Sequence, residues 1–145
     1  MKKLLIIMLC VMLLAAQACA EDMPEPTPEP STKPSFDYDA IMADPDAHYG
    51  TLDYMRGTVA RYDDLGQVFN AFDHSFSLLL SVDGEIRHTV LVYSGYNEGE
   101  DHPQEGDTIW VHGSCMGVKD IKSGLGLVLR FPTYVCREFQ IFPRQ

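Results

Sequence analysis

Five histidines are the most versatile side chains in this sequence, because imidazole binds metal ions and transfers protons near neutral pH. No two of them have a short ligand spacing such as HxH or HxxxH, and no cysteine pair has the spacing of a zinc site. The sequence therefore predicts no metal site and no cofactor. The five are His48, His74, His88, His102 and His112.

The densest group of acids lies in residues 98–107. Calcium favours several carboxylate oxygens on one flexible loop, but the spacing here does not match an EF-hand. A solvated acidic loop and a low-affinity calcium site both stay open. The acids are Glu98, Glu100, Asp101, Glu105 and Asp107.

Catalysis by a side-chain nucleophile requires a base beside it. The chain has no GxSxG, no HExxH and no P-loop motif. Ser75 follows His74 directly, but consecutive residues of a strand point to opposite faces. We therefore predict no catalytic residue and no enzyme, with an extracytoplasmic metal-assisted hydrolase as an alternative.

The charge of the chain is strongly negative. Its 145 residues hold 11 Lys and Arg against 21 Asp and Glu, a net charge of −10. Without Lys2 and Lys3, which precede an apolar leader, 9 basic residues face 21 acidic ones, a net −12. Nucleic-acid binding depends on cations that displace counterions from phosphates. The composition therefore excludes nucleic acid as a partner.

Residues 1–20 have the pattern of an export signal, with two lysines, 13 apolar residues and a small-residue end. The apolar run is too short to span a bilayer, which takes about 20 residues. Two ends are open. ACA at 18–20 fits a signal cleavage site, whereas AQAC at 16–19 resembles a lipobox, in which the signal is 1–18 and Cys19 is lipidated.

The next segment, 21–35, is a predicted disordered linker that holds five of the nine prolines. Such a sequence is extended and semi-rigid, at about 3 Å per residue. A spacer is useful where one end is tethered to a membrane, so the linker favours lipidation of Cys19. We expect an extracytoplasmic protein, anchored in the cell membrane or else secreted.

Only Cys115 and Cys136 remain after the leader. Outside the cytoplasm a lone pair of cysteines commonly forms a disulfide. Their midpoint falls within the glycine-containing segment 123–127, so a hairpin turn there would place the two residues opposite each other. We predict a disulfide, with two buried thiols as the alternative.

The remaining residues, 36–145, form the predicted folded domain. It begins with one short helix, 36–43, which must end near Asp44 because Pro45 disfavours helical geometry in the residue before it. The pattern then predicts strands, with turns at 63–66 and at Asp83-Gly84. The expected strand regions are 51–62, 68–82, 85–93, 108–118 and 127–135, with a last segment at 138–142.

One helix and five strands without helical crossovers predict an all-β, five-stranded barrel. The order and lengths favour an OB fold, with an SH3-like barrel as the alternative. OB barrels bind ligands on the face of strands 2 and 3, between the first-second and fourth-fifth loops. The predicted ligand-binding residues there are Tyr62, Phe69, Phe72, Arg87 and Tyr93, with Phe76, Lys119 and Lys122 nearby.

Several motifs resemble the small OB-fold domains of exported bacterial lipoproteins, chiefly from Firmicutes. ADPDAHYG at 43–50 with RGTV at 56–59 is similar to their NPDxYxGKxVxxxGxV opening. GDTIWVHGSCMG at 106–117 is similar to their GDxVxVYGTxxG strand, and 126–132 resembles their final strand. The resemblance covers residues 38–142. It implies the fold but no catalytic residues, since the family is largely uncharacterised.

Together these features predict an exported OB-fold module that binds a protein, peptide or glycan outside the cytoplasm. A structural or assembly subunit of an envelope complex is a further alternative.

Overall fold

The computed structural model describes residues 36–142, all within one compact unit, Thr32–Gln145. The predicted leader 1–20, the lipidation site Cys19 and the linker 21–35 lie outside the described residues. Every described strand pairs within this unit, and its core is built from its own residues. This part of the chain therefore carries the interactions needed to fold without the residues before it.

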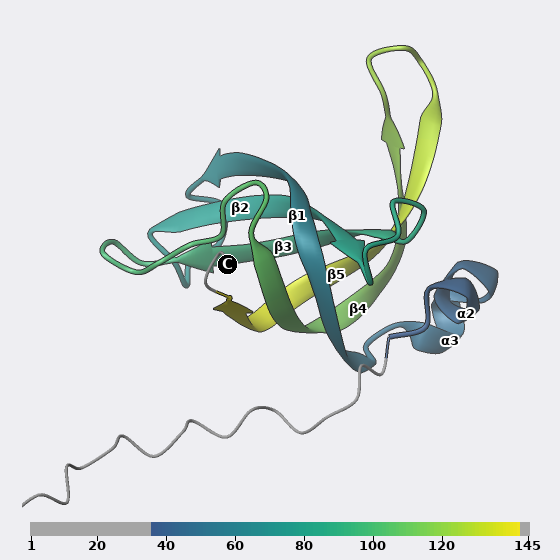
Figure 1. The fold of residues 1–145 in the computed structure, drawn as a ribbon, viewed down its shortest axis with the longest axis horizontal. Coiled ribbons are helices and arrows are strands. Elements are labelled where there is room, and N and C mark those ends of the chain that lie inside the picture. The colour runs from purple at the N-terminus through teal and green to yellow at the C-terminus, as the bar shows by residue number, and fades with distance from the viewer. Residues whose placement is uncertain (1–35, 143–145) are drawn as a thin grey trace, which may run out of the picture. The chain divides into compact units, whose positions relative to one another are not determined.

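Five strands close into a barrel in the order β1-β2-β3-β5-β4, with β4 paired back onto β1 (Figure 1). All pairs are antiparallel except β3 with β5, which pair in parallel over three positions. The predicted all-β, five-stranded OB-fold-like barrel is confirmed. Its strands are β1 (Leu52–Gly66), β2 (His74–Val82), β3 (Thr89–Tyr96), β4 (Thr108–Lys122) and β5 (Val128–Ile141).

The barrel interior is filled by alternate side chains of the strands. Phe76, Leu78, Leu80 and Val82 of β2 are each at most 2% exposed. Because strand residues alternate between faces, the residues between them point outward. Burial of the inner set removes apolar surface from water and stabilises the closed barrel.

Two short helices precede the barrel where we predicted one: α2 (Tyr38–Ala43) and α3 (Pro45–His48). The first ends before Asp44, as expected from the following proline. Pro45 then opens the second helix, where its missing N–H is no loss, and the Asp44 side chain accepts a hydrogen bond from the Ala47 N–H at 3.2 Å. Among residues 36–142 no helix is long and apolar enough to cross a membrane.

The first strand is longer than predicted. It continues through the expected turn at 63–66 and ends at Gly66. At Gly57 the strand lies so close to β2 that an added Cβ would be 2.5 Å from the Ser81 carbonyl oxygen. A register shift between Val59 and Arg61 marks a bulge at Ala60. The predicted strand 68–82 is consequently shorter, because residues 67–73 form the loop between β1 and β2.

The next hairpin contains the predicted Asp83-Gly84 turn, whose residues both have positive φ, 55° and 74°. Pairing resumes only at Thr89, opposite Ser81. Ile86, within the predicted strand 85–93, lies instead in the loop and is 88% exposed. The two final predicted segments, 127–135 and 138–142, are one continuous strand, β5.

The predicted disulfide is not formed: Cys115 and Cys136 are both free, buried thiols. The β4–β5 register pairs Lys122 with Val128, and a shift between Cys115 and Val118 then moves the strands further out of line. Cys115 consequently lies opposite Tyr134, and Cys136 opposite Gly113. The midpoint argument was wrong for two reasons: the turn centres the ladder on Leu125, which alone would place Cys115 opposite Val135, and the bulge adds a second shift of one residue.

Candidate functional site

The outer face of β2 and β3 is the face on which the predicted ligand-binding residues were expected. Directly paired residues of neighbouring strands point to the same side. The register places Asp63, Ser77 and Tyr93 in one row across β1, β2 and β3. Arg61, Leu79 and Leu91 form the adjacent row. We call these six residues the outer rows. Ser77 and Leu91 are buried, and the other four are half-buried or exposed.

The loop 67–73 folds over one end of this face. The Ser75 hydroxyl, in β2, accepts hydrogen bonds from the Val68 and Phe69 N–H groups at 3.1 and 2.9 Å. Ser75 is opposite Gly95, and a Cβ added at Gly95 would be 2.4 Å from the Phe72 ring. The glycine thus leaves the space in which Phe72 packs. Phe69 and Phe72 are held beside the outer rows.

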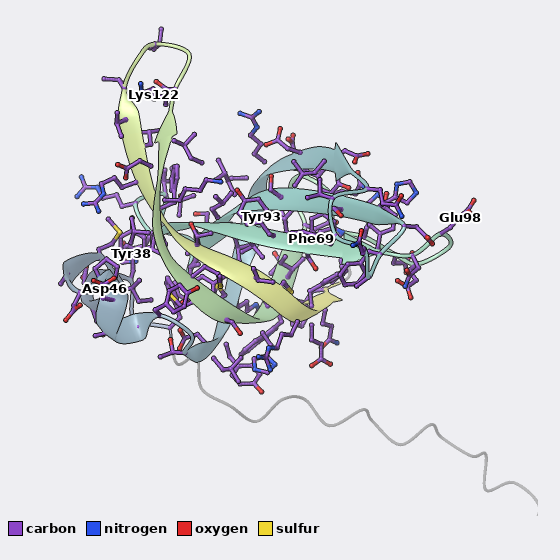
Figure 2. The ribbon with its side chains drawn as sticks, turned by 180° about the vertical axis from the view of Figure 1, so that it is seen from behind. Tyr38, Asp46, Phe69, Tyr93, Glu98 and Lys122 are labelled. Atoms are coloured by element: carbon purple, nitrogen blue, oxygen red, sulfur yellow. The ribbon has the colours of Figure 1, made fainter. Side chains whose placement is uncertain are left out.

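The other side of the face is bounded by the hairpin of β4 and β5. Lys119 Nζ is 2.7 Å from the Tyr93 hydroxyl and 5.1 Å from the centre of its ring. This is a hydrogen bond combined with a cation–π contact. Tyr93 therefore lies between a cation and the row of Ser77 and Asp63; Phe69, Tyr93 and Lys122 are labelled in Figure 2.

Two predicted ligand-binding residues lie elsewhere. The Tyr62 side chain packs against the core, 5.4 Å between ring centres from Phe76. Burial, with a smaller contribution from Tyr96, raises the pKa of Tyr62 to about 12. Arg87 is exposed in the loop between β2 and β3, at the opposite end of β2 from the loop 67–73.

Sequence reasoning missed two charged residues of the outer rows. Arg61 and Asp63 form an ion pair at 2.8 Å. The Asp63 carboxylate, as acceptor and neighbouring charge, raises the pKa of Arg61. No local sequence signal marks them, because the bulge at Ala60 turns Arg61 outward and Tyr62 inward.

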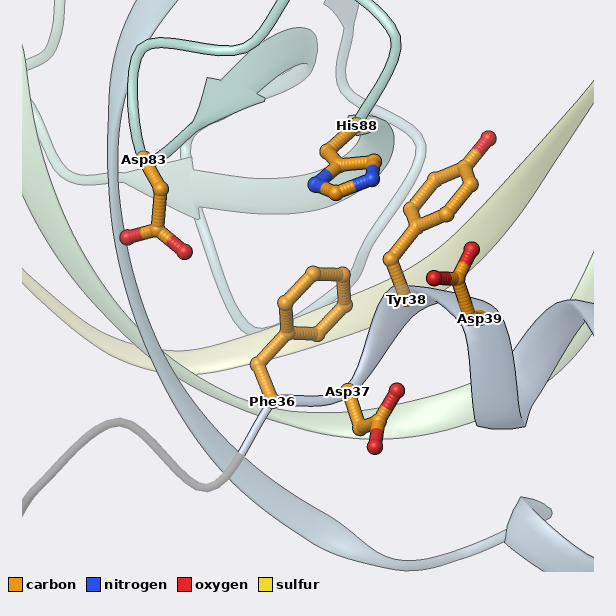
Figure 3. A pocket seen from close by; sticks show the side chains of 6 residues that line it. All are labelled: Phe36, Asp37, Tyr38, Asp39, Asp83 and His88. Carbon is orange, nitrogen blue, oxygen red and sulfur yellow. The ribbon is translucent and has the colours of Figure 1, made fainter.

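A separate hollow of about 210 Å³ lies between the start of α2 and the loop after β2 (Figure 3). Tyr38 stacks on His88 there, with ring centres 4.7 Å apart. Asp37 is already engaged, since it accepts a 3.0 Å hydrogen bond from the Ala40 N–H. The hollow is smaller than a typical ligand pocket, which measures about 300–1,000 Å³. Its lining is Phe36, Asp37, Tyr38, Asp39, Asp83 and His88.

Carboxylates of the acidic loop 98–107 accept backbone hydrogen bonds. Glu100 accepts one from the Asn97 N–H, Asp107 from Gln104, and Glu105 from Tyr62, at 2.8–3.2 Å. Across residues 36–142, no three His, Cys, Asp or Glu side chains are grouped so that they could hold a metal ion. A calcium site and a metal-assisted hydrolase therefore have no preassembled ligand set in this part of the chain.

The chain matches no protein-family model and no curated protein sequence.

Proposed function

We propose that this protein is an exported, lipid-anchored, non-catalytic binding module of the cell envelope. Its ligand is an extracytoplasmic protein, peptide or glycan, which binds to the outer rows between the loop 67–73 and the β4–β5 hairpin. The anchor is Cys19, and the linker 21–35 connects it to the barrel. The leader pattern and the proline-rich spacer support this location.

One observation carries the binding proposal: aromatic rings, a hydroxyl and charges of both signs share a single outer face. The rings of Phe69, Phe72 and Tyr93 offer stacking surfaces for sugars or apolar side chains. Arg61 and Asp63 offer hydrogen bonds to polar groups of the same ligand. Mixed aromatic and polar surfaces of this kind favour protein, peptide and glycan ligands over polyanions.

Photo-crosslinking in the intact envelope tests the binding site. The photoreactive analogue benzoylphenylalanine replaces Phe69 in one variant, Tyr93 in a second and Tyr49 in a matched control. Tyr49 is 62% exposed but lies outside the outer rows. We expect adducts from positions 69 and 93, and competition by purified peptidoglycan if the ligand is a glycan. Adducts of equal yield at position 49, or none at 69 and 93, would overturn the proposed site.

Mass spectrometry of the native protein tests the location independently. A diacylglycerol on an N-terminal Cys19 supports the anchor. A mature chain that begins at Glu21 would show secretion without an anchor, and a retained leader would contradict export.

A further inference from the structure

The β4–β5 hairpin extends well beyond the barrel (Figure 1). Its outer part, residues 119–131, is here called the hairpin arm. Its strands pair from Lys119 with Phe131 to Lys122 with Val128, and residues 123–127 form the tip. The arm is thus a two-stranded ribbon with solvent on both faces.

The tip of the arm carries apolar side chains with nothing packed over them. Leu125 is 89% exposed, Leu127 61%, Val128 53% and Leu129 45%. Consecutive residues 127–129 point to alternate faces of the ribbon, so both faces are apolar. A cluster of this kind at the end of a projection, unlike scattered exposed residues, marks a contact surface. Apolar side chains on all sides of a tip can all be buried by insertion into a lipid layer, whereas a flat protein surface would cover only one side of the tip.

The arm is positively charged, in contrast to the rest of the domain. It holds Lys119, Lys122 and Arg130 against Asp120, a net +2. The other described residues hold 4 basic and 16 acidic side chains, a net −12. Arg130 is paired with Asp120 at 3.1 Å, which leaves the two lysines as the uncompensated charges. An anionic surface therefore attracts the arm and repels the remainder of the domain.

Backbone groups at the tip are hydrogen-bonded to one another. The Ser123 N–H donates to the Leu127 carbonyl at 2.8 Å, and the Gly126 N–H to the Ser123 carbonyl at 2.9 Å. The Leu127 N–H donates to the Ser123 hydroxyl at 3.1 Å. Unsatisfied backbone groups are the main obstacle to entry into lipid. The closed turn lowers this obstacle.

We propose that the tip of the hairpin arm inserts into the interface of an anionic lipid bilayer. The side chains of residues 125, 127 and 128 enter the region between headgroups and acyl chains. Lys122 lies three residues from Leu125, at most about 10 Å along a strand. Interfacial segments enter to about 5–10 Å. Lys122 is paired with Val128 at the barrel side of the inserted residues, so its long side chain extends from there towards the phosphates. The proposal is independent of the ligand bound at the outer rows.

Vesicle co-sedimentation of residues 32–145 tests this proposal without the leader or Cys19. The probes are vesicles of phosphatidylglycerol with phosphatidylethanolamine, and vesicles of phosphatidylcholine alone. We expect binding to the first, weakened by salt, and little binding to the second. Leu125→Ser with Leu127→Ser should reduce partitioning at least tenfold, because it removes the inserted apolar surface. Lys122→Gln should reduce it roughly fivefold.

Ile86 provides the matched control, because it is 88% exposed in a loop outside the arm. Ile86→Ser should leave vesicle binding unchanged. In a second readout, the fluorescence of Leu125→Trp should shift to the blue with anionic vesicles and be quenched by brominated lipids, whereas Ile86→Trp should not respond.

Two results would overturn insertion: equal vesicle binding by the wild type and the double leucine variant, or no binding of the wild type to anionic vesicles, most directly if it occurs together with a dimer that the leucine substitutions dissociate. The second result would show that the tip binds another copy of the chain. Unchanged melting temperatures of the variants exclude loss of folding as the cause.

Discussion

The hydroxyl of Tyr134 donates a 2.7 Å hydrogen bond to Oδ2 of Asp53 inside the barrel, across 81 positions of sequence. Tyr134 is fully buried and Asp53 is 8% exposed. Thr51 also donates to the same oxygen, at 3.3 Å. Burial first, and the neighbouring carboxylate second, raise the pKa of Tyr134. This contact joins β5 to the start of β1, the two strands between which β4 lies.

The first prediction concerns this hydrogen bond. Tyr134→Phe keeps the ring and removes the donor, so Asp53 loses a partner within the protein. We expect the free energy of unfolding to fall by about 1–3 kcal/mol, measured by urea denaturation. Tyr49→Phe, at a position 62% exposed, should change it by less than about 0.5 kcal/mol. Equal stabilities of the two variants would show that the buried contact contributes nothing.

The second prediction concerns stability at alkaline pH. Burial raises the pKa of the Cys136 thiol from 9.0 to about 11, so the folded state holds this proton more tightly than the unfolded state. The stabilisation is complete below pH 9 and is lost as pH rises towards 11. The contribution of this thiol is at most about 2–3 kcal/mol.

Urea denaturation on both sides of this range, for the wild type and for Cys136→Ala, measures the effect. The alanine variant should show a shallower decline, although its stability at neutral pH is lower. Tyr62 and Tyr134 act in the same direction, since their pKa values are also raised. Identical slopes would mean that the thiol of Cys136 titrates alike in both states.

Much of the fold was predictable from local patterns, because apolar alternation and turn residues determine where strands lie. The candidate site was less predictable. Inward residues fall at odd positions from Met55 to Val59, and continued alternation would place Tyr62 outside. The bulge at Ala60 reverses this alternation, so Arg61 faces outward. No local signal in the sequence marked this extra residue. As a result, the charged Arg61 lies on the predicted face in place of the aromatic Tyr62.

The cysteine pairing failed for a related reason. The observed ladder is centred on Leu125, since Lys122 pairs with Val128, and this is already one residue out of the register that would pair Cys115 with Cys136. The shift between Val118 and Cys115 then moves the strands by one residue more. Phe69 and Phe72 were expected in a strand but lie in the loop between β1 and β2. They still lie beside the predicted face, because this loop adjoins the face of β2 and β3.

The third prediction concerns Gly95. Gly95→Ala places a methyl group 2.4 Å from the Phe72 ring and 2.6 Å from the His74 carbonyl oxygen. We expect a loss of about 1–3 kcal/mol in urea denaturation, and displacement of the loop 67–73. Gly124→Ala is the control, because a Cβ there meets nothing within 4 Å.

Combination with Phe72→Ala separates the two clashes at Gly95. The ring is then absent, so Gly95→Ala should lower the free energy of unfolding by less than it does in the wild type. The loss that remains measures the clash with the His74 carbonyl oxygen. An unchanged cost would show that Phe72 does not pack over this glycine.

The fourth prediction concerns Lys119 and Tyr93, which connect the base of the hairpin arm to the outer rows. A double-mutant cycle with Lys119→Met and Tyr93→Phe measures the hydrogen bond between them, because the phenylalanine keeps the ring. We expect a coupling energy of about 0.5–1 kcal/mol. The pair Asp120 and Arg130 provides the comparison: its side chains are 61% and 56% exposed, and exposed ion pairs couple weakly and are screened by salt. The Lys119 and Tyr93 coupling should therefore persist in high salt while that of Asp120 and Arg130 falls. A Lys119 and Tyr93 coupling near zero would mean that the arm is not held against the candidate site.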